Sequence, residues 1–170
     1  MEDSLSIIFA VIISLLLMFL FPMIDTWEMQ DNLSYIVVYS ATVDFVDTCR
    51  NVGFISDSSY AGFASKVQAT GNSYDIRMEH KQFIPDVRGY ANHYTNEIKD
   101  ELSKDDNIYK LNQYDYFSVS VKNTNRTQAT LLSDFVTGGS GTNFRIGVTY
   151  GGVVWTSRDD ISNNSTDITD

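Results

Sequence analysis

The chain has 170 residues, which is enough for one modest domain with an appendage. Hydrophobic residues make up 43% of it, and 12 basic against 22 acidic residues give a net charge of −10. This acidity argues against a nucleic-acid partner, because phosphate contacts need clustered Lys and Arg side chains. The one cysteine, Cys49, excludes an internal disulfide and a zinc site built on several thiolates.

The charges divide the chain near residue 50. Residues 1–49 contain seven acids and no Lys or Arg, whereas residues 50–170 contain all 12 basic residues and 15 acids. Together with the hydropathy pattern, this division predicts three parts. These are a long N-terminal helix over residues 1–53, a small globular head over 54–158, and an acidic tail over 159–170.

An apolar run opens the N-terminal part: residues 7–21 read IIFAVIISLLLMFLF, and the run extends from Leu5 to Ile24. These residues cover about 30 Å, the thickness of the hydrocarbon core of a bilayer. A buried core helix and a cleaved secretory signal are the alternative interpretations. Against a signal, no basic segment precedes the run and no small-residue cleavage site follows it. Because no Lys or Arg flanks the run, we expect that a basic leader has been removed.

Helical periodicity continues beyond the apolar run to about residue 51. Residues 25–50 contain no Gly or Pro, and three- and four-residue spacings separate Leu33, Ile36, Ser40, Val43 and Asp47. Gly53 is the expected end of the helix, as a cap in the left-handed conformation. A single helix of about 70 Å needs a partner along its length.

An apolar N-terminal stretch, then Pro22, an amphipathic continuation and a small domain resemble a mature type IV pilin. Within that superfamily the acidic continuation is most similar to the small tight-adherence (TadE-like) pseudopilins. Pro22 is expected to bend or locally melt the helix, because proline lacks an N–H and clashes with the preceding turn. Where pilins place a glutamate at the fifth mature position this chain has Leu5, which leaves Glu2 and Asp3 to pair with a neighbour's terminal amine.

The resemblance implies a structural subunit of an extracellular type IV pilus-like filament, with no enzymatic activity and no cofactor. Its partners would be further copies of itself, the cytoplasmic membrane before assembly, prepilin peptidase and the pilus assembly machinery. The alternatives are a single-pass membrane protein that displays a monomeric binding head, and an enzyme on a membrane anchor. The residues expected to pack the helices together are Ile8, Ile12, Leu16, Phe19, Pro22, Trp27, Leu33, Ile36 and Val43.

Acidic side chains follow the apolar run along the same helix, at Asp25, Glu28, Asp31, Asp44 and Asp47. Burying such groups without partners costs several kcal/mol each in order of magnitude. In a filament they must therefore meet water, or Lys and Arg side chains from neighbouring heads.

The head is predicted to be an α+β domain, with about four antiparallel strands on one or two short helices. Residues 56–71 have the spacing of a short helix with a serine cap. Alternating patterns predict strands over 74–80, 116–121 and 144–150. Gly151-Gly152 then predicts a hairpin turn before a return strand.

No constellation typical of an enzyme or of a metal site is present in the head. His80 is predicted on a strand and His93 in a Tyr- and Asn-rich loop, without enough converging partners for metal binding or acid–base chemistry. Cys49 is expected to be a small packing residue. Of the N-x-[ST] triplets, the one at Asn125 lies in a predicted turn and is the best candidate for glycosylation.

Overall fold

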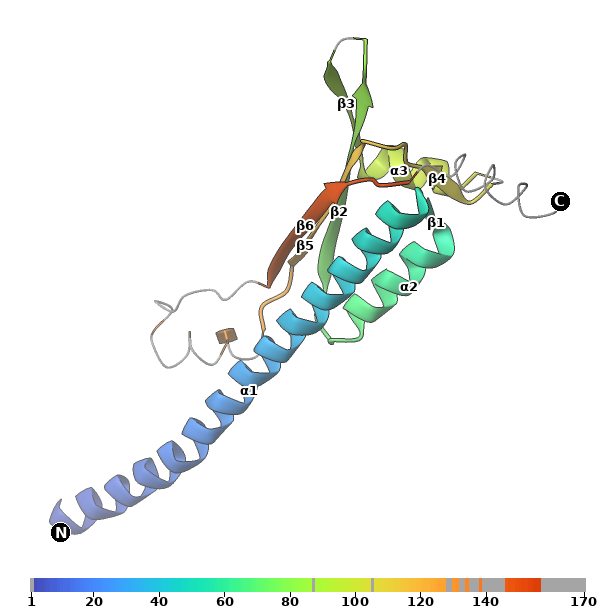
Figure 1. The fold of residues 1–170 in the computed structure, drawn as a ribbon. Helices are drawn as coiled ribbons and strands as arrows, with labels where there is room; N and C mark the ends of the chain where they lie inside the picture. The colour runs from blue at the N-terminus through green and yellow to red at the C-terminus, as the bar shows by residue number, and fades with distance from the viewer. Residues whose placement is uncertain are drawn as a thin grey trace. The chain divides into compact units, whose positions relative to one another are not determined.

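The computed structural model describes residues 2–86, 88–104, 106–127, 130–131, 134, 138 and 146–156, with side chains from residue 4 onward. The chain divides into two compact units, Met1–Ser34 with Arg126–Phe144 and Tyr35–Asn125 with Arg145–Asp170. The fold is α+β, as predicted (Figure 1). In chain order its elements are α1 (Glu2–Val52), β1 (Phe54–Ser56), α2 (Asp57–Gln68), β2 (Tyr74–Ile84), β3 (Gly89–Tyr94), α3 (Thr95–Leu102), β4 (Ile108–Lys110), β5 (Tyr116–Asn123) and β6 (Gly147–Val153).

The helix α1 runs without interruption through Pro22. The predicted local melting is therefore wrong. Proline removes one hydrogen bond, that of its missing N–H, from a helix of 51 residues whose neighbouring Leu, Met and Phe residues are compatible with helix. The carbonyl of Pro22 accepts a further bond from Thr26 Oγ1 at 2.8 Å. The helix ends as expected at Gly53, which has a φ of 73° and donates its N–H to Cys49 O at 2.9 Å.

The helix α2 begins at the predicted cap. The Ser56 side chain accepts from Ser59 N at 3.2 Å, and the Ser59 hydroxyl accepts from Ser56 N at the same distance, which is a reciprocal capping box. In Figure 1, α2 lies beside the C-terminal part of α1. The contact is a stack of Phe45 on Phe63 with ring centroids 4.6 Å apart.

The main sheet has four antiparallel strands in the order β3-β2-β5-β6, and β1 and β4 form a separate two-stranded sheet. The predicted strands over 74–80 and 116–121 are confirmed, and both extend further along the chain. Met78 pairs with Val119, and Val121 pairs with Val148, so alternate apolar residues share one face of the sheet.

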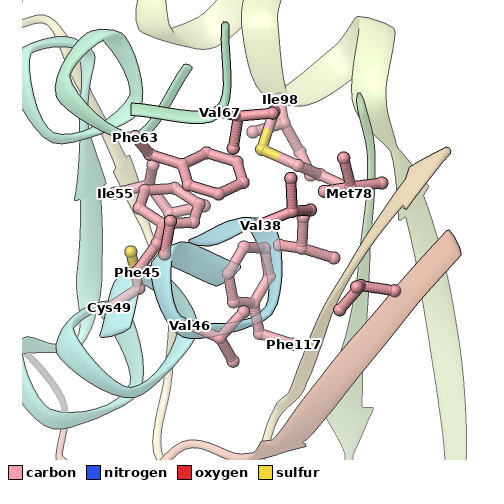
Figure 2. Packing of buried hydrophobic residues seen from close by; sticks show 14 of the residues in the cluster. Val38, Phe45, Val46, Cys49, Ile55, Phe63, Val67, Met78, Ile98 and Phe117 are labelled. Atoms are coloured by element: carbon pink, nitrogen blue, oxygen red, sulfur yellow. The ribbon is translucent and has the colours of Figure 1, made fainter. Parts of the chain in front are cut away.

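That face is buried against α1 and α2. Phe45 of α1 meets Phe117 of β5 edge to face, with centroids 6.2 Å apart. Figure 2 shows the same cluster, in which the labelled side chains come from α1, α2, α3 and the strands β1, β2 and β5. The core thus joins the C-terminal part of α1 to the head, and the labelled members are Val38, Phe45, Val46, Cys49, Ile55, Phe63, Val67, Met78, Ile98 and Phe117.

The structure corrects the hairpin predicted at Gly151-Gly152. Both glycines lie within β6, where Gly151 pairs with Ser118 and Gly152 with Phe117. A Cβ atom at Gly151 would come within 2.4 Å of Ser118 Cβ, and one at Gly152 within 2.5 Å of the Arg50 guanidinium carbon. The prediction was wrong because these glycines permit close approach, between β5 and β6 and beneath Arg50, and do not form a turn.

Candidate functional site

The most prominent surface feature is the apolar N-terminal part of α1. A window of 18 residues in this helix has a mean hydropathy of 3.0, and none of that window is buried within the chain. By length and composition the helix can cross a membrane. The large apolar side chains exposed along the run are Leu5, Ile7, Ile8, Phe9, Val11, Ile12, Ile13, Leu15, Leu16, Leu17, Met18, Phe19, Phe21 and Met23.

Apolar exposure does not stop where the run ends. Met29, Leu33 and Ile36 are 63%, 53% and 58% exposed, and their spacings of four and three residues place them on one face of α1. We call these three residues the second stripe. The side chains of Val38 and Phe45, on the face turned to the head, are buried. Around residues 36–38 the helix therefore carries apolar side chains both on an exposed face and on the face that its own head covers.

Most residues predicted for helix packing lie on this exposed surface. Trp27 and Val43 are half-buried. The side chains of Glu2 and Asp3, proposed to pair with a terminal amine, lie outside the described residues, as does the tail over 159–170. The exposed members of the predicted set are Ile8, Ile12, Leu16, Phe19, Pro22, Leu33 and Ile36.

The acidic residues that follow the run have different surroundings. Asp25, Glu28 and Asp44 are exposed. Asp31 is buried, and its Oδ2 has no hydrogen-bond partner among the described residues. The three exposed carboxylates keep their solvation, or are available to cations from outside the chain.

Asp47 obtains its cation from its own helix. Asp47 Oδ1 lies 2.7 Å from Arg50 Nη1, one turn further on, and accepts a bond from the Tyr150 hydroxyl at 3.2 Å. Arg50 Nε also donates to the carbonyl of Val153 at 2.7 Å, and its guanidinium lies 5.8 Å from the ring centroid of Trp155. These contacts fasten the end of α1 to β6, so this acid–base pair serves the head.

A second candidate is a buried polar cluster in the head, centred on His80. His80 Nε2 lies 2.8 Å from Asp115 Oδ2, and Nδ1 lies 2.8 Å from the Tyr109 hydroxyl. A neutral His80 that carries its proton on Nε2 donates to Asp115 and accepts from Tyr109, which satisfies both ring nitrogens. Burial, followed by the nearby carboxylates Glu97, Asp115 and Glu101, raises the pKa of Tyr109, so its hydroxyl stays protonated and able to donate.

Asp115 also fixes the backbone around it. Its carboxylate accepts from Phe83 N at 2.7 Å and from Asn112 N at 2.8 Å, in addition to His80. It is 1% exposed. A buried carboxylate with three donors ties the end of β2 to the segment before β5, which is a structural role and not one that leaves an atom free for chemistry.

The prediction that His93 lies in a loop is wrong. It lies on β3, directly opposite His80, and the two rings stack with centroids 5.6 Å apart. Its Nδ1 is 2.9 Å from Glu97 Oε2. The strand reads GYANHY, which has neither strict alternation nor an apolar run, so periodicity alone gave no signal for it.

Cys49 is buried and free, as expected of a packing residue. Burial raises the pKa of its thiol to about 12, so it stays protonated and unreactive. Asn125 is exposed, but its side-chain amide already donates to Asn72 Oδ1 at 3.0 Å and its Oδ1 accepts from Ser73 N at 2.9 Å. Among the described residues, no group of three or more His, Cys, Asp or Glu side chains could hold a metal ion.

Comparisons with known protein families, with curated proteins and with solved structures found no match to this chain. The protein is therefore described from its own sequence and structure. It has a long N-terminal helix that can cross a membrane, followed by a small antiparallel sheet with short helices, an order of elements compatible with that of a pilin.

Proposed function

We propose that this chain is a structural subunit of an extracellular type IV pilus-like filament, assembled by packing of α1 against α1 of other copies. The observation that carries the proposal is the second stripe, because it extends apolar exposure past the length that lipid can cover. Residues 5–24 already account for the roughly 30 Å of a bilayer core. Ile36 lies a further 12 residues along, about 18 Å at 1.5 Å per residue.

A helix from another copy is a suitable cover for both exposed regions. Packed helices exclude water from each other's apolar faces without lipid, and the second stripe has the three- and four-residue spacing that helix packing uses. A head-to-tail contact between two different faces of the subunit propagates as a helical assembly when its rotation does not close into a ring. The exposed acids Asp25, Glu28 and Asp44 would then face water or basic groups of neighbouring heads.

Before assembly, the apolar run would hold the subunit in the cytoplasmic membrane. By resemblance, prepilin peptidase would process the N-terminus and the pilus machinery would extract the subunit into the filament. The head would form the outer surface, where adhesion is a further proposed use. None of these steps requires enzymatic activity or a cofactor from the chain itself.

The proposal is tested by electron microscopy of the sheared cell-surface fraction, with immunogold labelling of the head. We expect thin filaments labelled along their length. If the labelled protein is instead found as monomers that only detergent releases from membranes, the proposal fails. The single-pass anchor with a monomeric head would then replace it.

A further inference from the structure

A groove of about 630 Å³, lined by both polar and apolar groups, lies on the outer face of the main sheet, the face opposite the buried cluster. Arg77 of β2, Ser120 of β5 and Thr149 of β6 are successive partners across the strands and form its floor. Tyr94 and Lys99, from the junction of β3 with α3, line one side. All these residues belong to the same compact unit of the chain.

The groove combines hydrogen-bond donors with acceptors. The carboxylates of Asp75 and Glu79 accept, while Arg77 and Lys99 donate. The charges therefore balance, and Arg77 Nε is already bonded to Asp75 Oδ2 at 2.8 Å. An anion such as phosphate would need donors alone, and a metal ion would need acceptors alone. A ligand that carries many hydroxyl groups uses both, because each hydroxyl donates and accepts.

The side chains of the groove floor also carry hydroxyl groups, which can donate and accept. Thr149 Oγ1 donates to Ser120 Oγ at 2.9 Å, which leaves the Ser120 hydroxyl able to donate in turn. Ser118 lines the same groove and is buried. These short side chains give the floor hydrogen-bonding groups, and Ile76 and Met78 add apolar surface to the lining.

An aromatic ring lies beside these polar groups. Tyr94 is 56% exposed and is the direct cross-strand partner of Glu79. Side chains at paired positions lie about 5 Å apart at Cβ. A carboxylate next to an exposed ring can bind the two kinds of surface that a sugar presents: hydroxyls around its edge and C–H groups on its face.

An extended peptide is a weaker fit, although β2 has a free edge here. Strand β3 pairs with β2 only from Glu79 onward. The next residue whose backbone groups point away from β5 toward that edge is Met78. Thr95 Oγ1 accepts from Met78 N at 2.8 Å and donates to Met78 O at 3.1 Å. The backbone N–H and C=O of Met78 are thus already occupied, so a strand added at this point of the edge would have to displace Thr95.

From these observations we propose that the groove binds a neutral saccharide, with the ring of Tyr94 against a sugar face and Glu79 and Arg77 bonded to its hydroxyls. This inference goes beyond filament formation and does not depend on it.

The test is isothermal titration calorimetry of the full chain in a zwitterionic detergent without a sugar headgroup. The probes are neutral oligosaccharides of hexoses, N-acetylhexosamines and pentoses, a sulfated oligosaccharide, and an extended hexapeptide. We expect at least one neutral oligosaccharide to bind. Tyr94→Ala should weaken that binding about tenfold, whereas Tyr94→Phe, which keeps the ring, should change it less than about threefold.

Tyr90→Ala is the matched control, because Tyr90 lies on the same strand, is also 56% exposed and does not line the groove. It should leave the affinity unchanged. The proposal is overturned if no neutral oligosaccharide binds, if the sulfated probe or the peptide alone binds, or if Tyr94→Ala and Tyr90→Ala have equal effects. Because all measurements use unassembled protein, these results are independent of whether filaments form.

Discussion

The two parts of α1 differ in what covers their apolar side chains. Over residues 38–49 the helix buries Val38, Phe45 and Cys49 in the core of its own head. Over residues 5–24 most of its apolar side chains are exposed, Leu20 and Ile24 being half-buried, and Phe19 is 73% exposed. One continuous helix therefore contains a segment that stabilises the fold and a segment that the fold leaves uncovered.

The comparison shows that hydrophobicity alone does not identify core residues. Exposed apolar surface of this extent marks an interaction site in a soluble or membrane-associated protein. Substitutions in the two segments should consequently have separate effects, on head stability in one and on membrane insertion or assembly in the other.

Loss of stability should be greatest for a substitution at Phe45 of α1 and close to zero for one at Phe19 of the same helix. Phe45→Ala should lower the free energy of unfolding of the head by about 4 kcal/mol, because it removes a ring that stacks on Phe63 and leaves a cavity. Phe19→Ala is the control and should change it by less than about 0.5 kcal/mol. Urea unfolding of the full chain in detergent, followed by near-UV circular dichroism, measures both. Equal losses would contradict the division of α1 into two segments.

The next largest loss of stability should come from the buried polar cluster around His80 and Asp115. Asp115→Ala should cost about 3 kcal/mol, because it leaves the buried ring of His80 and the backbone N–H groups of Phe83 and Asn112 without their acceptor. Asp106→Ala, at an exposed position, should be close to neutral. The same unfolding assay applies. A near-neutral Asp115→Ala would show that the cluster does not stabilise the head.

A charge in the uncovered segment should weaken membrane insertion and leave the stability of the head unchanged. Ile12→Asp should cost about 3 kcal/mol of insertion free energy, since a carboxylate near the middle of a membrane span is unfavourable. The fraction of protein that resists carbonate extraction should fall, while the urea midpoint of the head should stay unchanged. Ile12→Leu is the conservative control and should insert normally. Full retention of Ile12→Asp in membranes would contradict the assignment of this segment.

The stability of the head should also depend weakly on alkaline pH, through Cys49 in the covered segment of α1. Burial raises the pKa of the Cys49 thiol from 9.0 to about 12, so above pH 9 the unfolded chain loses this proton before the folded chain does. Stability contributed by the protonated thiol is complete below pH 9 and decreases as the pH rises toward 12. The decrease is at most about 1.4 kcal/mol per pH unit from this group.

Unfolding at pH 8 and pH 10.5 measures that slope. Cys49→Ala should show a smaller loss between the two values, although it is less stable at pH 8 because of the cavity. Tyr109, whose pKa is also raised, contributes equally in both proteins and cancels from the difference. Identical slopes would show that the thiol is not protected in the folded head.

Local patterns were sufficient to predict several elements. The apolar run and the absence of Gly and Pro over residues 25–50 predicted α1, and Ser56 marked the start of α2 through a local capping bond. Alternation predicted β2 and β5, because each buries one face only. These signals are contained within short windows of sequence.

Other features depend on contacts between distant segments and carried no local signal. The strands β1 and β4 have three residues each, which is too short for a period to emerge. His80 and Asp115 are separated by 35 positions and meet only because β2 and β5 pair. Pattern alone also gave no signal that Val38 and Phe45 are covered by the head, because exposed and covered apolar residues alternate along the same helix.

Ile36→Asp tests whether the second stripe packs against other copies. This substitution places a charge beyond the bilayer length, at a site that is 58% exposed in the single chain. We predict normal membrane insertion and a normal urea midpoint, but no filaments in the sheared fraction by electron microscopy. Gln30→Asp, which adds the same charge at an exposed polar position, should still form filaments. Filaments of normal number and length from Ile36→Asp would contradict the account.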